Sequence, residues 1–276
     1  MLLNTLKGGF VRLVDTMPAT DADRAIVDAA RVSYGKGTKA SRDDRALIRY
    51  LMRHRHTSPF EMVELKFHVR APIFVARQWF RHRTGSFNEI SGRYSVLDDS
   101  AWIPTPDEMG LQSIINGQGR TSNMDIEFAE AACRELLIAT EAAQGAYNKN
   151  LGSGVARELA RTCLPVSTFT EWVWKVDLHN LMRFIQLRAD RHAQPEIQIY
   201  ARALAKMVEQ VAPLAWAAFE EYVNEAHTLS RSEFQAIRNV LTPEQITAVT
   251  DDLTKRGASA REIAELREAL HPQKPA

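Results

Sequence analysis

The sequence predicts a mixed α+β fold, in which a central, mostly antiparallel sheet packs against helices and a small helical extension follows. Three segments, 10–17, 62–71 and 168–177, alternate apolar and polar residues with the period of two that is typical of half-buried strands. Elsewhere apolar residues recur every three or four positions, as they do in amphipathic helices. Beyond His227 aromatic residues become scarce. We therefore expect a main domain over 1–228 and a helical extension over 229–276.

In the N-terminal part, two helices should follow the first strand. Apolar residues at helical spacing predict the first over 21–34. The second should begin at Ser41, where Ser-x-x-Asp resembles a capping box, and should run to Arg55. Pro59 then ends helical structure, because proline disfavours the helical conformation in the residue before it.

After the strand 62–71, a helix should begin at Pro72, since proline suits the first helical turn. It should continue to Arg83, so that Arg77 and Arg81, four residues apart, share one face. Turn-forming residues then predict a long surface loop over 104–119.

The second half of the chain should be mostly helical. Apolar spacing predicts a long helix over 125–148, and Pro165 should end a shorter one over 153–163. Two more helices are expected after the strand 168–177, and then three capping boxes in succession. The two helices should span 178–190 and 196–223. The three capping boxes are Ser230/Glu233, Thr242/Gln245 and Ser259/Glu262, and the end of the chain, 271–276, should be frayed.

Composition narrows the functional classes. With 276 residues, 45% hydrophobic and 25% charged, the chain is typical of a globular protein. No apolar run approaches the roughly 20 residues that span a bilayer, so we expect a cytoplasmic protein without a membrane partner. A net charge of +1 argues against nucleic-acid binding by the whole surface. Two cysteines 30 residues apart and no HExxH motif predict no metal site.

The segment from Arg81 to Ser95, RHRTGSFNEISGRYS, is rich in groups that bind ligands. Between Arg70 and Arg93 the sequence contains five arginines and only one carboxylate. A guanidinium is a planar fork that matches phosphate oxygens and stays charged at any working pH. A solvated basic surface is the ordinary explanation of such a run, but Trp79, Phe80 and Phe87 would then expose apolar area to water. The pattern favours a site for an anionic ligand.

A second constellation lies at 187–195, LRADRHAQP, where one helix should end and another begin. It again combines two arginines with imidazole, carboxylate and amide groups. Helix ends often contact ligands, although a salt-bridged surface corner is an equally good explanation of this segment alone. Three Gly-x-Gly segments lack the context of a dinucleotide loop or a P-loop, so any nucleotide must be held differently.

The segment 81–95 resembles the RHR-x7-S signature of the flavin-dependent thymidylate synthases, here Arg81-His82-Arg83 through Ser91. The resemblance covers roughly 10–222 and extends to four more segments in the family's order: HTSPFE at 56–61, APIFVARQWFRHR at 71–83, ELARTCLP at 158–165 and LRADRHAQPEIQ at 187–198.

The resemblance implies a mixed α/β homotetramer that binds FAD across subunit boundaries without a Rossmann loop. It implies the conversion of dUMP to dTMP with 5,10-methylenetetrahydrofolate and NADPH as co-substrates. By position, FAD would be held by Ser58, Arg81, His82, Arg83 and Glu89, joined by Asp177, Leu178, His179 and Arg183 from a neighbouring subunit's copy. By position, dUMP would be held by Gln78, Trp79, Phe80, Arg81, Glu89, Ile90, Ser91, Gly92, Arg93 and Arg161.

Arg188 corresponds to the arginine that activates uracil in this family. A permanent cation beside the ring favours loss of the N3 proton and enriches C5 in electron density. Arginine stays protonated and cannot itself be the base. Ser91 is expected to donate a hydrogen bond to the substrate, since no base near it in the sequence would activate it as a nucleophile.

Two other functions fit parts of the sequence. Clustered arginines with aromatic neighbours could bind single-stranded RNA, with the bases stacked on the rings. The capped C-terminal helices could instead serve a helical interaction scaffold. The first alternative predicts a colourless protein whose RNA affinity falls with salt, and the second predicts no small-molecule turnover.

Overall fold

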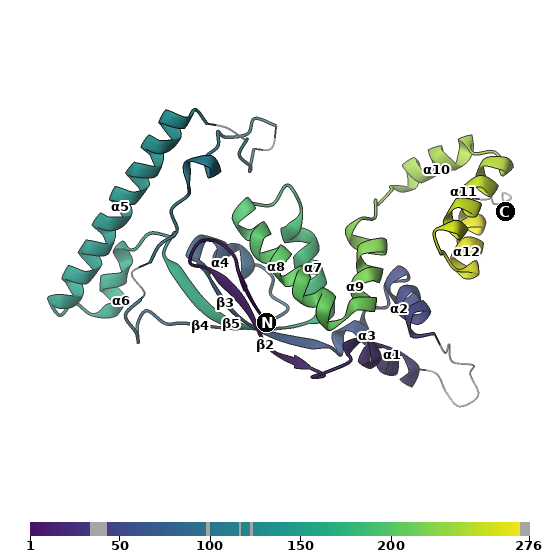
Figure 1. Ribbon diagram of the computed structural model, residues 1–276, viewed down its shortest axis with the longest axis horizontal. Helices are drawn as coiled ribbons and strands as arrows, with labels where there is room; N and C mark the ends of the chain where they lie inside the picture. Colours follow the sequence, from purple (N-terminus) through teal and green to yellow (C-terminus); the bar gives the residue numbers. More distant parts are fainter. Residues whose placement is uncertain (34–42, 98–99, 116, 122–123, 271–276) are drawn as a thin grey trace. The chain divides into compact units, whose positions relative to one another are not determined.

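The structure, a computed structural model, describes residues 1–33, 43–97, 100–115, 117–121 and 124–270. The chain forms two compact units, Met1–Phe219 and Glu220–Ala276 (Figure 1). This division falls ahead of the boundary expected at 228/229. Among the described residues, no helix combines the length and the apolar character that crossing a lipid bilayer requires.

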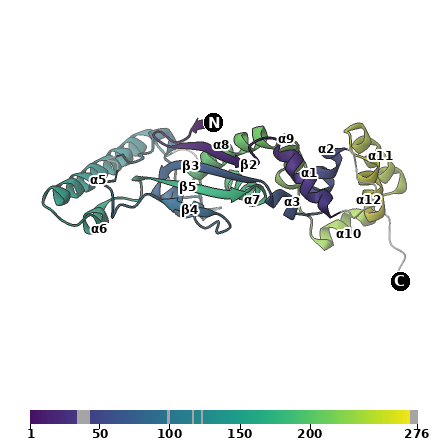
Figure 2. The same ribbon diagram turned by 90° about the horizontal axis from the view of Figure 1, so that it is seen from below.

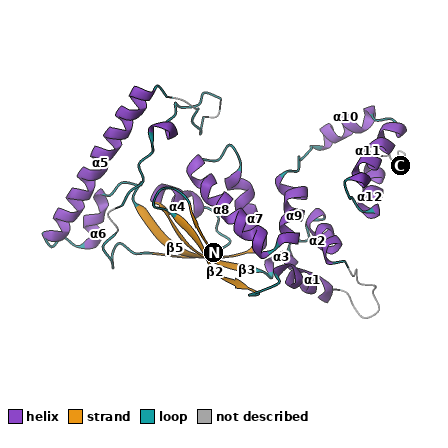
Figure 3. Ribbon diagram, viewed as in Figure 1, coloured by secondary structure: helices purple, strands orange, loops and turns teal. Residues whose placement is uncertain are grey.

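An antiparallel five-stranded sheet forms the centre of the first unit, in the order β1-β2-β3-β5-β4 (Figure 3). The three alternating segments are confirmed as its strands β2 (Phe10–Met17), β3 (Glu64–Pro72) and β5 (Phe169–Asp177). The short outer strands β1 (Leu2–Asn4) and β4 (Ser86–Glu89) were not predicted. β4 lies inside the arginine-rich segment 81–95, for which no strand was predicted, and pairs with β5.

The core lies between one face of this sheet and the helices α4 (Ile73–Trp79), α7 (Leu178–Ala189) and α8 (Pro195–Val211) (Figure 1), and α7 and α8 lie behind the strands in Figure 2. On this face Trp172 and Trp174 of β5 are buried. The ring of Trp79 meets both of them edge-on, with centroids 5.2 Å apart. This aromatic packing buries apolar area at the C-terminal end of α4, and it thereby holds the residues that follow the helix in place.

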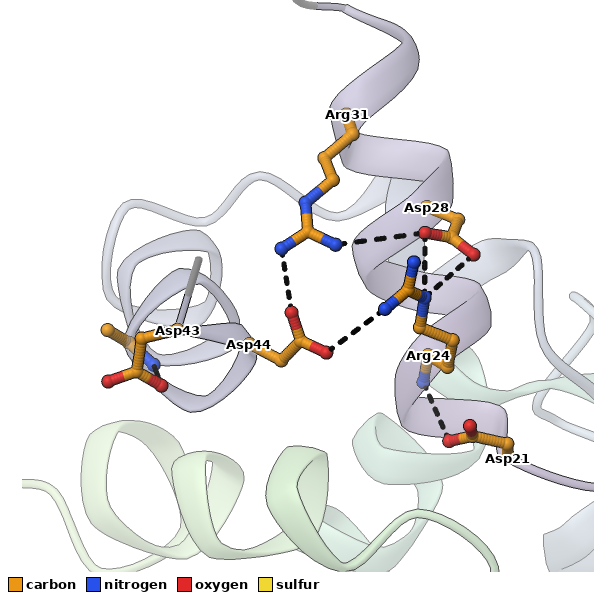
Figure 4. Close-up of polar contacts among 7 residues, drawn as sticks. Asp21, Arg24, Asp28, Arg31, Asp43 and Asp44 are labelled. Carbon is orange, nitrogen blue, oxygen red and sulfur yellow. Dashed lines mark hydrogen bonds and ion pairs between the residues drawn. The ribbon is translucent and has the colours of Figure 1, made fainter. Parts of the chain in front are cut away.

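Ion pairs join the helices α1 (Ala22–Val32) and α2 (Asp44–Arg53) (Figure 4). Arg31 bonds Asp44 at 2.7 Å, and Arg24 lies 3.7 Å from the same carboxylate. Ser41, the expected cap of the second helix, lies outside the described residues. The cap is Asp43, whose side chain accepts a hydrogen bond from the Ala46 N–H at 3.1 Å, so the prediction of Ser41 as cap was wrong.

Three other predicted helices differ from the structure. The helix expected over 72–83 is α4, which starts after Pro72 and already ends at Trp79. The helix expected over 153–163 starts only at Arg157, because Gly154 adopts a left-handed φ of 80° ahead of it, and α6 (Arg157–Ala160) then passes into the short 3-10 turn η2 (Arg161–Cys163). The helix expected over 196–223 is interrupted between α8 and α9 (Pro213–Phe219), since Pro213 has no N–H to continue the ladder.

The remaining helices of the first unit are α3 (Ser58–Glu61), η1 (Pro106–Glu108) and α5 (Ile126–Gly152). The α5 helix confirms the one expected over 125–148. It contacts α6, η1 and η2, and buries only Ala129 and Tyr147. Most of its surface is therefore exposed in a single chain.

The second unit contains η3 (Glu220–Asn224), α10 (Arg231–Val240), α11 (Pro243–Lys255) and α12 (Ala260–Leu270). All three predicted capping boxes are confirmed. Each Ser or Thr hydroxyl accepts a hydrogen bond from the backbone N–H three residues later at 3.3 Å. Each Glu or Gln side-chain oxygen in turn accepts a hydrogen bond from the backbone N–H of that Ser or Thr at 2.6–2.8 Å. The expected frayed end, 271–276, lies outside the described residues.

Candidate active site

The two arginine-containing constellations meet in the folded chain. Arg188, in the last turn of α7, donates from Nε to Nε2 of His82 at 3.0 Å and from Nη2 to the carbonyl of Gln78 at 3.1 Å. The side-chain amide of Gln78 also hydrogen-bonds the side chain of Gln194. Segments that are more than 100 residues apart in the sequence thus form one site.

Core packing explains why these side chains converge. Trp79 is fully buried, so the neighbouring Gln78 and Arg81 at the end of α4 point away from the core. Phe184 buries the inner face of α7, where its ring centroid lies 4.6 Å from that of Trp79 and 4.7 Å from that of His82. Arg188, one helical turn beyond Phe184, is then directed at His82.

Two neighbouring cavities open around Arg188. The main cavity has a volume of about 1090 Å³ and the small cavity about 450 Å³. The main cavity is lined by Arg77, Gln78, Phe80, Arg81, Gln118, Gln186, Leu187, Arg188, Asp190, His192, Ala193 and Gln194. The small cavity is lined by Arg81, His82, Arg83, Thr84, Asn180, Arg183, Gln186, Leu187 and Arg188. Arg81, Gln186, Leu187 and Arg188 belong to both.

The small cavity is strongly cationic. Four guanidinium groups line it, and its lining contains no carboxylate. Within the described parts of the chain, none of these four arginines forms an ion pair; Arg81, Arg83 and Arg183 are exposed and Arg188 is half-buried. Such a cavity is complementary to a phosphorylated ligand.

Burial, together with the nearby positive charges of Arg188 and Arg183, lowers the pKa of His82 to about 4. The imidazole is therefore neutral at physiological pH and its Nε2 can accept the hydrogen bond from Arg188. Burial, with the charge of Arg81, also lowers the pKa of Arg188. Arg188 nevertheless stays charged, because an unperturbed guanidinium loses its proton only far above neutral pH.

Other residues expected to hold a flavin lie at the start of α7. Asp177 caps this helix by accepting from the N–H of Asn180 at 2.9 Å, and Asn180 lines the small cavity. Burial lowers the pKa of the neighbouring His179. Leu178 is fully buried and its N–H donates to the carbonyl of Val63 at 2.8 Å, so its side chain belongs to the core. Ser58 is exposed at the start of α3, which contacts α7.

A second group of expected ligand residues lines neither cavity. Glu89 accepts a hydrogen bond from Thr170 at 2.6 Å, and Arg93 bonds Glu158 at 3.1 Å. Gly92 is buried, and a Cβ there would lie 3.0 Å from Cδ of Arg161, so glycine permits this close approach. This second group consists of Glu89, Ile90, Ser91, Gly92, Arg93 and Arg161.

Trp79 differs from its sequence expectation. Trp79 was expected to contact a nucleotide, but its side chain is fully enclosed by aromatic core residues, whereas Phe80 does line the main cavity.

Several lining residues were absent from the expected set. Asp190, His192 and Gln194 come from the second constellation noted in the sequence, and Arg77 was predicted to share a helical face with Arg81, although α4 ends at Trp79. Among the described residues that line the main cavity, Gln118 and Gln186 had no sequence signal of a site.

Comparison with known proteins gives one consistent family. A family described as "Thymidylate synthase complementing protein" matches residues 12–214. A flavin-dependent thymidylate synthase of Thermus thermophilus is 52% identical over 96% of this chain and 95% of its own length. The enzyme of the same name from Wolbachia pipientis wMel is 47% identical over 91% of this chain and 87% of its own length.

A solved structure shows the same fold. The UMP/dUMP methylase PolB from Streptomyces cacaoi, bound with 5-Br UMP, superposes with a TM-score of 0.70 at 37% identity, covering 78% of this chain and 95% of PolB. Nearly all of PolB is thus matched by a part of this chain, while the alignment with the Thermus relative leaves only 4% of this chain uncovered.

Proposed function

This chain belongs to the family of flavin-dependent thymidylate synthases, and we propose that its two neighbouring cavities hold the FAD and the dUMP of the reaction. The chain is an enzyme that methylates dUMP reductively to dTMP, with 5,10-methylenetetrahydrofolate as the one-carbon donor and NADPH as the reductant. The observation that carries the placement is the convergence of Gln78, Arg81 and Arg188 on one cavity.

The residues of the small cavity fit FAD. Arg81, Arg83 and Arg183 supply unpaired positive charge for a diphosphate, and α7 continues from this cavity back to His179 and the cap residue Asp177. When bound, FAD relays reducing equivalents between NADPH and the one-carbon unit. His82, neutral and hydrogen-bonded to Arg188, would contact the flavin side of the site without adding charge.

Arg188 would act on the uracil ring of dUMP. Its charge favours the form of the ring that has lost the N3 proton, because an opposite charge stabilises an anion in a partly buried site. This shifts electron density to C5, the atom that accepts the one-carbon unit. The hydrogen bonds to His82 and to the Gln78 carbonyl hold the guanidinium in place before the substrate arrives.

The second group, Glu89–Arg93 with Arg161, would complete the site from another subunit. In one chain this group lines neither cavity, although it carries two arginines suited to a phosphate. A homotetramer with shared sites brings the two groups together. We assign the small-molecule chemistry to the first unit, and propose that 229–276 covers part of a subunit surface.

The test begins with the visible spectrum of the purified protein, followed by dTMP formation. A yellow protein that forms dTMP only when dUMP, methylenetetrahydrofolate and NADPH are all present supports the proposal. A colourless protein that binds single-stranded RNA with salt-dependent affinity, and forms no dTMP after FAD is added, would contradict it.

A further inference from the structure

A loop that contributes Gln118 reaches the main cavity from outside the two constellations. The loop is closed by its own hydrogen bonds: Ser113 N–H to the Gly119 carbonyl at 3.0 Å and Thr121 N–H to the Leu111 carbonyl at 2.8 Å. The Gln112 side chain donates to the carbonyls of Gly117 and Gly119, both at 3.1 Å. Hydrogen bonds within the loop therefore hold the described residues on both sides of Gln118.

One buried ion pair fastens this loop to α8. The Nη1 atom of Arg120 lies 2.7 Å from Oε1 of Glu196, whose side chain is only 2% exposed. The second carboxylate oxygen of Glu196 is buried without a hydrogen-bond partner among the described residues. A carboxylate in this setting depends on its cation. Glu196 stands two residues after Gln194, so the loop is fixed to the same helix end that lines the main cavity.

We propose that Gln118 is a further ligand-binding residue of the main cavity, that its ligand group is the imide edge of a ring bound there, and that Arg120 positions it through Glu196. The inference rests on the proposed function, because that function puts two imide-bearing rings, uracil and the flavin, at this site. Neither Gln118 nor Arg120 lies in the segments that carry the family resemblance.

The chemistry of the lining supports an imide. Gln118 is one of four carboxamides on the main cavity, with Gln78, Gln186 and Gln194. A carboxamide presents a donor beside an acceptor, which matches an imide edge, where an N–H lies between two carbonyls. It carries no charge, so it can pair with the ring before and after the N3 proton is lost. The neighbouring guanidiniums suit phosphate instead.

The first test replaces Gln118 by Leu, which keeps a similar volume and removes both hydrogen-bonding groups. The KM for dUMP and the dissociation constant for FAD are measured, the latter by flavin fluorescence. We expect about a tenfold rise in one of them, roughly the effect of one hydrogen bond to a buried partner. A rise in the KM for dUMP identifies uracil as the ligand, and a rise in the FAD constant identifies the flavin.

If neither constant changes by more than about twofold, the assignment of Gln118 is overturned. Gln118→Asn is the second variant, since it keeps the amide and shortens its reach; it should give an intermediate value. The turnover of the wild-type protein distinguishes a failure of the proposed function from a failure of the role assigned to Gln118. A wild-type protein that forms no dTMP contradicts the proposed function, whereas an active wild type with an unaffected Gln118→Leu contradicts only this inference.

The role of Arg120 is tested by comparing two variants. Arg120→Gln leaves Glu196 buried and unpaired, so it should lower the melting temperature and raise the same constant as Gln118→Leu. The double variant Arg120→Gln/Glu196→Gln removes both charges and should recover the melting temperature while the constant stays raised. Recovery of both together would show a purely structural ion pair. Arg256→Gln, in an exposed pair with Asp252, is the matched control and should change neither.

Discussion

At the scale of single residues, Arg188 is distinguished by its partners. Its guanidinium is held by a neutral imidazole and a backbone carbonyl, so its charge is left for a substrate. We predict that Arg188→Ala keeps FAD but lowers the rate of dTMP formation by about 100-fold or more, as expected when one stabilising charge is removed from a transition state. Rapid-quench kinetics with FAD-saturated enzyme measure this.

Arg188→Lys is the matched control, because it keeps the charge but loses the planar fork that reaches both partners. It should retain part of the activity. A rate for Arg188→Ala equal to that of the wild type would remove Arg188 from the chemistry.

His82 makes a pH dependence predictable. Its pKa is about 4 in the folded protein, against an ordinary value of 6.5. As the pH falls from 6.5 towards 4, the unfolded chain takes up a proton that the folded chain does not, so the folded state loses stability over this window. Above pH 6.5 both states are neutral and the contribution is constant.

We therefore predict that the melting temperature of the FAD-free protein falls more steeply between pH 6.5 and 4 in the wild type than in His82→Gln. Glutamine cannot titrate, but its side-chain oxygen can still accept the hydrogen bond from Arg188. If the melting temperatures of the two proteins, measured by calorimetry, fall equally steeply over this pH range, His82 is not held neutral in the folded protein.

At the scale of elements, α9 depends on a residue of α1 that is far away in the sequence. The carboxylate of Asp23, 7% exposed, accepts from the N–H groups of Leu214 and Ala215 at 2.8 and 2.9 Å. These are N-terminal N–H groups of α9, which no turn of the helix itself can satisfy. The contact caps α9 from a distance.

Asp23→Ala should destabilise the first unit by about 1–3 kcal/mol, because it leaves buried N–H groups without partners. Asp28→Ala, which removes an exposed carboxylate from the same helix, should cost less than about 1 kcal/mol. Chemical denaturation followed by tryptophan fluorescence checks both, since all five tryptophans lie in the first unit. Equal effects of the two variants would contradict the capping role.

The elements also show what local sequence can and cannot determine. β3 and β5 were predictable because each buries alternate residues on one face of the sheet. β4 was not, since three of its four residues are polar and it becomes a strand only by pairing with β5. Similarly, the motifs identified Arg81 and Arg188 as candidates, but their convergence depends on how α4 and α7 pack. Trp79 lies within a functional motif, but its side chain is buried in the core, which the motif alone does not reveal.

At the scale of the whole molecule, α5 points to assembly. Phe128 is 71%, Leu136 44% and Ile138 60% exposed, and at about 3.6 residues per turn Leu136 and Ile138 lie on nearly opposite sides of the helix. A helix with apolar residues on several sides is normally buried, and large exposed apolar patches mark interaction surfaces. In the proposed tetramer, α5 would be covered by another subunit.

The double variant Phe128→Glu/Ile138→Glu should therefore reduce the assembled mass below that of a tetramer in sedimentation experiments. Charges buried at an interface without partners are strongly unfavourable. Glu130→Gln, on the same helix, removes an exposed charge and should leave the mass unchanged. A double variant that still sediments as the wild type would exclude α5 from the interface.

Because the group Glu89–Arg93 lines neither cavity in one chain, we infer that the sites are shared between subunits, and complementation between two variants tests this inference. Arg188→Ala and Arg93→Ala, each inactive alone, are co-expressed with different tags, and mixed tetramers are isolated by both tags. If each site takes Arg188 from one subunit and Arg93 from another, about a quarter of the sites in a random mixture are intact and dTMP formation returns to roughly that fraction. Mixed tetramers that remain as inactive as the two parents would show that each site is built within a single subunit.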